Sequence, residues 1–465
     1  MATGVARPVW RRTLGSSLFV PALVILCGLF IAKLILEASA YYIVVATVAV
    51  VLGLVLVRNL QFGVLLYFFL AALAFGESPA IQSPHSGYKA GLMPSQVFLG
   101  FLALLWLIRA AFFERSKIVR SELNLPLVVL AVVSIASLAT NNILRGSREL
   151  LFHQMLITQI AEVGLMCFSI CAFFLAANTL KDRKWVRAIF APVVLLGLYF
   201  AAHRIFGFEF PIPMIWGSFL LAAAIAFVYS KLLFENLDRG RSISLGLLLA
   251  VMLFAAYKDL SWVSGWLAVT GVILVVSYHR SKAMALVLFA LILIVLLVNP
   301  GIYHSIHEES SLGGDFDRFV IWQDAFKMFM KINPILGVGP GNYHPFVYWH
   351  NTLWFGGRTY TTAHSNYAQM GAELGLVGLA VFLWVIVSGI RAGRRASRTA
   401  PSDTRWLPIA ATSIFAALAA SSLFGDYLFP SRGNNGIVTF GTTVYTWLIM
   451  GAAVAAANLR DDQSE

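Results

Sequence analysis

The stretch Ala283–Val298, AMALVLFALILIVLLV, contains no charged residue and is long enough to enter the hydrocarbon core of a bilayer as a helix. Comparable runs occur at Ala40–Val57, at Leu125–Ala139 and on both sides of Pro192–Ala202. The chain is 59% hydrophobic and 12% charged, whereas soluble domains average roughly 45–50% apolar and about 25% charged residues. The sequence therefore predicts an all-α, polytopic membrane helical bundle, a single integral membrane domain over residues 1–465.

The apolar runs predict about fourteen transmembrane helices. The first begins near Ser17 and is too long for the apolar part of a cleavable signal, so we expect it to be a span. The three cysteines, Cys27, Cys167 and Cys171, all lie within apolar runs and are expected to be packing residues. The formal charge of +12 does not indicate nucleic acid here, because basic connectors on the cytoplasmic side of a membrane protein explain most of it.

The distribution of Lys and Arg predicts the orientation. With the N-terminus in the cytoplasm, the connectors on that side carry roughly twice as many basic residues as those outside. An even number of helices would return the C-terminus to the cytoplasm. The cytoplasmic set includes Arg7–Arg12, Arg109–Arg120, Lys181–Arg187, Lys231–Arg241, Arg280–Lys282 and Arg391–Arg405.

One long connector, residues 300–365, is predicted to lie outside the membrane. Long loops rich in Trp, Tyr, Gly and His are usually functional. Within it, residues 317–332 repeat apolar side chains at a helical period that includes Trp322 and Phe326. We expect an amphipathic helix at the outer membrane interface, ending at Asn333-Pro334.

Several outer side chains are candidates for chemistry. Arginine is suited to bidentate phosphate binding, although each arginine alone is more often a snorkelling side chain or a loop ion pair. His364 precedes a predicted helix and can exchange a proton near neutral pH, although one interfacial histidine is more often only a hydrogen-bonding group. Glu162 and Glu373 lie inside apolar helices, and a structural ion pair is the favoured role for Glu373. The outer arginines are Arg145, Arg148, Arg204, Arg318, Arg358 and Arg432.

Other signatures are weak. Gly337, Gly339 and Gly341 could cradle phosphate but neither follow a strand nor open a helix, and Asp315-Phe316-Asp317 is a single acidic triplet without a soluble domain. The sequence contains no Walker motif, no HExxH motif, no metal-binding cysteine spacing and no nucleophilic serine elbow. We expect no metal and no cofactor.

Two parts of the chain resemble the O-antigen ligase and O-antigen polymerase superfamily. The specific part runs from Arg318 to about Leu383, and a weaker similarity covers Arg204–Leu220. The remaining helices resemble those of the family only in their general apolar character, without a specific motif. The specific part contains Arg318–Trp322 (RFVIW), Asn333–Tyr343 (NPILGVGPGNY), Ala363–Tyr367 (AHSNY) and Glu373–Leu379 (ELGLVGL).

The resemblance implies a metal-independent, inverting glycosyltransferase of the bacterial inner membrane, with its active site facing the periplasm. The donor would be a glycan on undecaprenyl diphosphate and the acceptor a glycan or lipid-A core, with other polysaccharide assembly proteins as further partners. Arg204 and Arg318 would bind the diphosphate, and His364 would be the general base. Asn366, Glu373 and Trp322 would be supporting residues.

Two alternatives remain. Two motifs depart from the family pattern: Ser365 separates His364 from Asn366, and Pro213-Met214 stands where the family tends to have Pro-Asn. Within the enzyme class, these departures and the helix number favour a polymerase slightly over a ligase. A transporter or flippase of lipid-linked oligosaccharides is the alternative of another class. It would show charged residues along a path at mid-membrane and repeats in the two halves, and the sequence shows neither.

Overall fold

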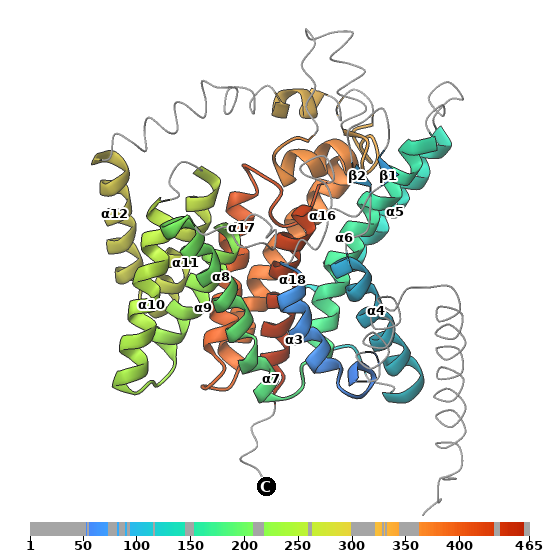
Figure 1. The fold of residues 1–465 in the computed structure, drawn as a ribbon. Coiled ribbons are helices and arrows are strands. Elements are labelled where there is room, and N and C mark those ends of the chain that lie inside the picture. Colours follow the sequence, from blue (N-terminus) through green and yellow to red (C-terminus); the bar gives the residue numbers. More distant parts are fainter. Residues whose placement is uncertain are drawn as a thin grey trace, which may run out of the picture. The chain divides into compact units, whose positions relative to one another are not determined.

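The computed structural model describes residues 53, 55–72, 81–82, 89–90, 94–114, 117–144, 153–207, 218–258, 263–298, 321–327, 330, 333–343, 362–431 and 438–459. The chain divides into two compact units, residues 1–63 and 64–465, and nearly all of the described elements belong to the second. Its apolar sequence runs form helices, as the composition predicts, and the expectation of an all-α protein is confirmed (Figure 1). The only described strands are two residues long each, β1 (Ile81–Gln82) and β2 (Lys89–Ala90), paired antiparallel.

Thirteen α-helices are described, together with one π-helical turn, η2 (Arg109–Glu114). The helices are α3 (Leu60–Leu70), α4 (Pro94–Ile108), α5 (Asn124–Leu144), α6 (His153–Thr179), α7 (Arg183–Ala188), α8 (Phe190–Phe206), α9 (Ser218–Phe234), α10 (Arg239–Lys258), α11 (Val263–Arg280), α12 (Lys282–Val298), α16 (Asn366–Thr399), α17 (Trp406–Ser421) and α18 (Val438–Ala457).

Six candidate membrane spans occur among the described residues, so this is a multi-pass membrane protein. They are Ser95–Phe112, Gln159–Thr179, Arg183–Phe206, Arg239–Lys258, Asn366–Thr399 and Phe440–Ala457. Shorter apolar stretches occur in α3, α5, α9, α12 and α17. The total of about fourteen spans stays a prediction.

Helices α17 and α18 form the buried centre of the second unit. α17 packs against α9, α11, α16 and α18, and α18 packs most extensively against α6 (Figure 1). The indoles of Trp406 and Trp447 are fully buried there. Close approach of α18 to α6 requires Gly451, because a Cβ at that position would lie 2.4 Å from the carbonyl oxygen of Phe173. α12, by contrast, exposes Leu286, Val287 and Leu297, as a lipid-facing helix does.

The basic connectors gather at one end of this unit. Arg187 of α7 forms an ion pair with Asp403, which joins α7 to the α16–α17 turn. Arg395 contacts Glu122 at 3.0 Å. This is the lower end in Figure 1, where α7 lies, whereas the start of α16 lies at the opposite end. These connectors are far apart in sequence, yet they lie at the same end of the bundle. That this end faces the cytoplasm stays a prediction.

Candidate functional site

The opposite end of the bundle contains a break in α16. At Gly375 the backbone has φ 67° and ψ −164°, which interrupts the helix. The groups freed by the break pair with residues 333–339 of the preceding connector. This pairing of residues 333–339 with residues 372–377 is called the clasp below. Its hydrogen bonds run from Val338 N to Ala372 O (2.9 Å), Gly339 N to Glu373 O (2.8 Å), Leu376 N to Pro334 O (2.9 Å) and Val377 N to Ile335 O (3.2 Å).

Glycine is required on both sides of the clasp. Gly337 and Gly375 both have a positive φ. A Cβ on Gly337 would lie 2.4 Å from the backbone carbon of Glu373, and a Cβ on Gly375 would lie 2.4 Å from the carbonyl oxygen of Ile335. The sequence of the glycine-rich segment was compatible with phosphate binding. In the structure, its Gly337 instead allows the connector backbone to approach the backbone of α16 closely.

The carboxylate of Glu373 is buried in the clasp and is only 5% exposed. Its Oε1 accepts hydrogen bonds from the backbone N–H of Tyr343 (3.2 Å) and from Nε2 of Gln369 (2.7 Å). The sequence favoured an ion pair for this residue, but among the described residues its hydrogen-bond donors are neutral. Candidate cations such as Arg318 lie outside the described residues, so the ion pair of Glu373 stays a prediction.

His364 lies in a strained turn directly before α16. Its φ is 45°, and it is the only non-glycine residue with a positive φ in the described part of the chain. This left-handed conformation is uncommon outside Gly, Asn, Asp and His and costs of order 1 kcal/mol or more, so the surroundings must hold it. The backbone N–H of His364 donates to Oγ1 of Thr362 at 2.8 Å, and Ser365 caps α16 by accepting from Ala368 N. The imidazole is half-buried.

Gln369 connects this turn to the clasp. Its Oε1 accepts the backbone N–H of Ala363 at 3.0 Å, while its Nε2 donates to Glu373. Glu373 lies more than two helical turns beyond His364 and does not pair with it directly. The carboxamide of Gln369 bridges that gap.

The connector between α17 and α18 anchors the turn from the other side. The carboxamide of Asn366 donates to the carbonyl of Phe429 (2.9 Å) and accepts from the N–H of Leu428 (2.9 Å). Asp426, only 3% exposed, accepts from Thr362 Oγ1 and from Asn366 Nδ2, both at 3.4 Å. Sequence reasoning named Asn366 but missed Asp426 and Gln369. The sequence signal that could have identified Asp426 and Gln369 is the position of a carboxylate and a carboxamide near the outer ends of apolar segments.

Trp322 approaches the turn from the outer connector. Residues 321–327 are helical, and Nε1 of Trp322 donates to the carbonyl of Ala363 at 3.1 Å. Ile321 and Ala325 are buried against the same cluster, whereas Phe326 is 59% and Met330 49% exposed. The structure therefore brings Trp322, His364, Asn366 and Glu373 together. Placement of residues 317–332 at a membrane interface stays a prediction.

The arginines predicted to bind diphosphate are located only in part. Arg204 is exposed in the last turn of α8, and its guanidinium carbon lies 5.2 Å from the ring centre of Phe200. α8 packs against α9, whose Phe219 ring lies 4.2 Å from that of Tyr427, next to Asp426. The other candidate arginines (Arg145, Arg148, Arg318, Arg358 and Arg432) lie outside the described residues. Convergence of Arg204 and Arg318 on one cavity stays a prediction.

The fold and this cluster define a multi-pass membrane protein with a polar, strained site at one end of its helices. Residues 244–383 match the family model described as O-antigen ligase. The matched segment is less than a third of the chain and contains Arg318, Trp322, His364, Asn366 and Glu373, but neither Arg204 nor Asp426. The comparison with curated proteins found no match.

The family match confirms the resemblance to the O-antigen ligase and polymerase superfamily seen in the sequence. It supports a membrane glycosyltransferase activity of the O-antigen ligase or polymerase type.

Proposed function

We propose that the protein transfers a glycan from an undecaprenyl-diphosphate-linked donor to an acceptor hydroxyl at the periplasmic face of the bacterial inner membrane. The observation that carries the proposal is the strained His364 turn inside the family-matched segment. Non-glycine residues in rare backbone conformations cluster at active sites, where the surrounding structure over-determines them. The side chains of Thr362, Gln369 and Trp322 form hydrogen bonds with the backbone of this turn. The side chain of Asn366, the first residue of α16, anchors the end of the turn to Phe429.

The reaction is a single displacement at the anomeric carbon. The acceptor oxygen bonds to C1 as the bond from C1 to the diphosphate oxygen breaks, so the configuration at C1 inverts. His364 takes the proton of the attacking hydroxyl, and the lipid diphosphate leaves with the bonding electrons. Arg204 and Arg318 stabilise the charge that develops on the leaving group, which requires neither a metal nor a cofactor.

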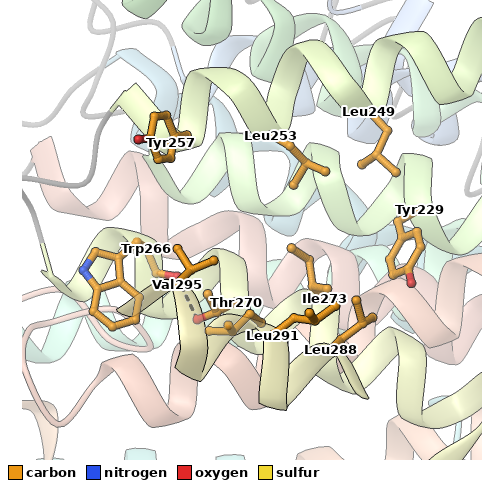
Figure 2. Close-up of a pocket in the computed structure, with 11 residues that line it drawn as sticks. Tyr229, Leu249, Leu253, Tyr257, Trp266, Thr270, Ile273, Leu288, Leu291 and Val295 are labelled. Atoms are coloured by element: carbon orange, nitrogen blue, oxygen red, sulfur yellow. Dashed lines mark hydrogen bonds between the residues drawn. The ribbon is translucent and has the colours of Figure 1, made fainter. Parts of the chain in front are cut away.

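The lipid tail of the donor has a candidate place between α9, α10, α11 and α12. A groove there has a volume of about 370 Å³ and almost entirely apolar walls, and Figure 2 draws the residues that line it. Tyr257, Trp266 and Val295 line it near the ends of α10, α11 and α12 that lie away from the basic connectors. Leu249 and Leu288 continue it towards the middle of the helices. A polyprenyl chain fits such a groove because its contacts are non-directional and apolar.

The test compares arginine variants of the purified protein with a lipid-linked oligosaccharide donor. Arg204→Lys and Arg318→Lys retain the charge but lose the planar fork that fits phosphate oxygens. We expect both to lower glycan transfer at least tenfold, with Arg239→Lys, an exposed residue at the opposite end, as the control. Wild-type activity in both variants would contradict diphosphate binding by these residues. Movement of the donor across the membrane without formation of a glycosidic bond would show a transporter instead.

The acceptor decides between the two members of the enzyme class. Extension of one lipid-linked glycan by another would show a polymerase, and transfer to a lipid-A core would show a ligase. The slight sequence preference is for a polymerase.

A further inference from the structure

A second groove lies at the other end of the bundle, where the basic connectors gather. It has a volume of about 520 Å³, and residues of α11, α12, α16 and α17 line it. Its walls are mainly apolar and include Leu274, Leu286, Phe289 and Ile390. Phe289 lies two helical turns beyond Lys282, roughly 10 Å along the axis. The groove therefore runs from the end of the bundle into the depth of the membrane-spanning helices.

Cationic side chains stand at the mouth of this groove. Lys282 is the first residue of α12, Arg394 lies on the last turns of α16, and both line the groove together with His279. Both cations are exposed, and Arg405 lies near His279 as well. The combination is a positively charged mouth over an apolar interior.

The described carboxylates do not neutralise this mouth. At this end, Glu122, Glu235, Asp238 and Asp403 form ion pairs, and each pairs with a cation outside the groove. Among the described ion pairs, none includes Lys282 or Arg394. Two cations that no carboxylate in the described part of the chain pairs with favour an anionic ligand.

We infer that this groove binds an anionic phospholipid, with its phosphate between Lys282 and Arg394 and one acyl chain along the apolar walls. Charge and depth together select this ligand: a free phosphate would leave the apolar interior uncovered, and a zwitterionic lipid would bring no net charge to the two cations. Basic pockets between transmembrane helices are a common form of lipid-headgroup site. This site is separate from the groove of Figure 2, because α12 lines that groove with Leu288, Leu291 and Val295, and this one with Leu286 and Phe289.

The experiment is a lipid titration of the purified full-length protein by native mass spectrometry, with phosphatidylglycerol and phosphatidylcholine as probes. Each basic residue near a membrane surface strengthens anionic lipid binding by a factor of about 5. We therefore expect Lys282→Gln with Arg394→Gln to weaken phosphatidylglycerol binding about 25-fold and to leave phosphatidylcholine binding unchanged. The matched control, Lys184→Gln with Arg239→Gln, removes two exposed charges at the same end that do not line the groove.

A third variant, Ala285→Phe, narrows the groove and keeps both cations. It should also weaken phosphatidylglycerol binding. Equal loss in the control pair would show a diffuse surface charge effect, and equal affinity for both lipids in the wild type would show no headgroup selection; either overturns the proposal. Competition by glycerol phosphate alone would indicate a free-phosphate site. A dimer that dissociates in the Lys282→Gln, Arg394→Gln protein without added lipid would indicate that a second copy fills the groove.

Discussion

Single residues at the candidate site act through the backbone as much as through their side chains. His364 has a φ of 45°, and Gly337 and Gly375 have positive φ values that let two backbones meet. The local sequence specifies these conformations through glycine and through hydrogen bonds from neighbouring side chains. At the break in α16, the connector supplies hydrogen-bond partners for the carbonyls of Ala372 and Glu373 and for the N–H groups of Leu376 and Val377.

The first prediction concerns the break in α16. Gly375→Ala should lower the stability of the folded protein by at least about 1 kcal/mol, because φ 67° with ψ −164° is a backbone conformation that only glycine adopts readily. The contact of the new Cβ with the carbonyl of Ile335 adds to this cost. Gly371→Ala, one turn earlier, is the control, because a Cβ there meets only Leu379 Cδ2 at 3.9 Å. Thermal unfolding in detergent measures both. Equal melting temperatures would show that the break does not depend on glycine.

At the scale of elements, the start of α16 is held by three segments: residues 321–327, residues 333–343 and the α17–α18 connector. Asn366 is the main contact between the start of α16 and the α17–α18 connector. Its carboxamide forms hydrogen bonds with the backbone N–H groups of Leu428 and Phe429 and with the carbonyl of Phe429. All these groups are buried, so loss of the carboxamide leaves them without partners.

The second prediction follows from this arrangement. Asn366→Ala should destabilise the protein by roughly 2–4 kcal/mol, since each buried polar group left unpaired costs about 1–3 kcal/mol. Asn458→Ala is the matched control, because that carboxamide makes one local bond to Val454 O at the end of α18. Denaturant or thermal titration should separate the two variants clearly. A similar small effect for both would mean that Asn366 is not an anchor.

The same elements show how far the sequence was informative. Apolar runs predicted the helices, and the family pattern selected Trp322, His364, Asn366 and Glu373, which the structure places in one cluster. The sequence did not predict Asp426, because its role arises from tertiary contacts between segments about 60 residues apart. It did not predict Gln369 either, because the contacts of its carboxamide with Ala363 and Glu373 depend on the folded turn before α16. It gave no signal for the hydrogen bond from the Tyr343 N–H to Glu373, because that contact depends on the connector folding back over α16.

At the scale of the whole molecule, the account depends on which side of the membrane the clustered site faces. The gathering of basic connectors at the opposite end favours a periplasmic site by the positive-inside rule. The long connector of residues 300–365 would then be accessible from outside.

The third prediction is a labelling pattern. In a background with Cys27, Cys167 and Cys171 replaced by serine, Ser310→Cys or Thr352→Cys should react with an impermeant thiol reagent on intact spheroplasts. Ser402→Cys, in the exposed α16–α17 turn, is the matched control and should react only after lysis. The reverse pattern would place the site on the cytoplasmic side.

The most direct test of the central claim is glycan transfer by purified wild-type and His364→Ala proteins with a lipid-linked donor in the presence of EDTA. General-base assistance contributes about 10²–10⁴-fold, so the variant should lose about that factor while it still inserts, folds and binds donor. The wild type should keep its full rate in EDTA. Full activity of His364→Ala, or a wild-type rate abolished by EDTA and restored by Mg²⁺, would contradict metal-independent transfer with His364 as the base.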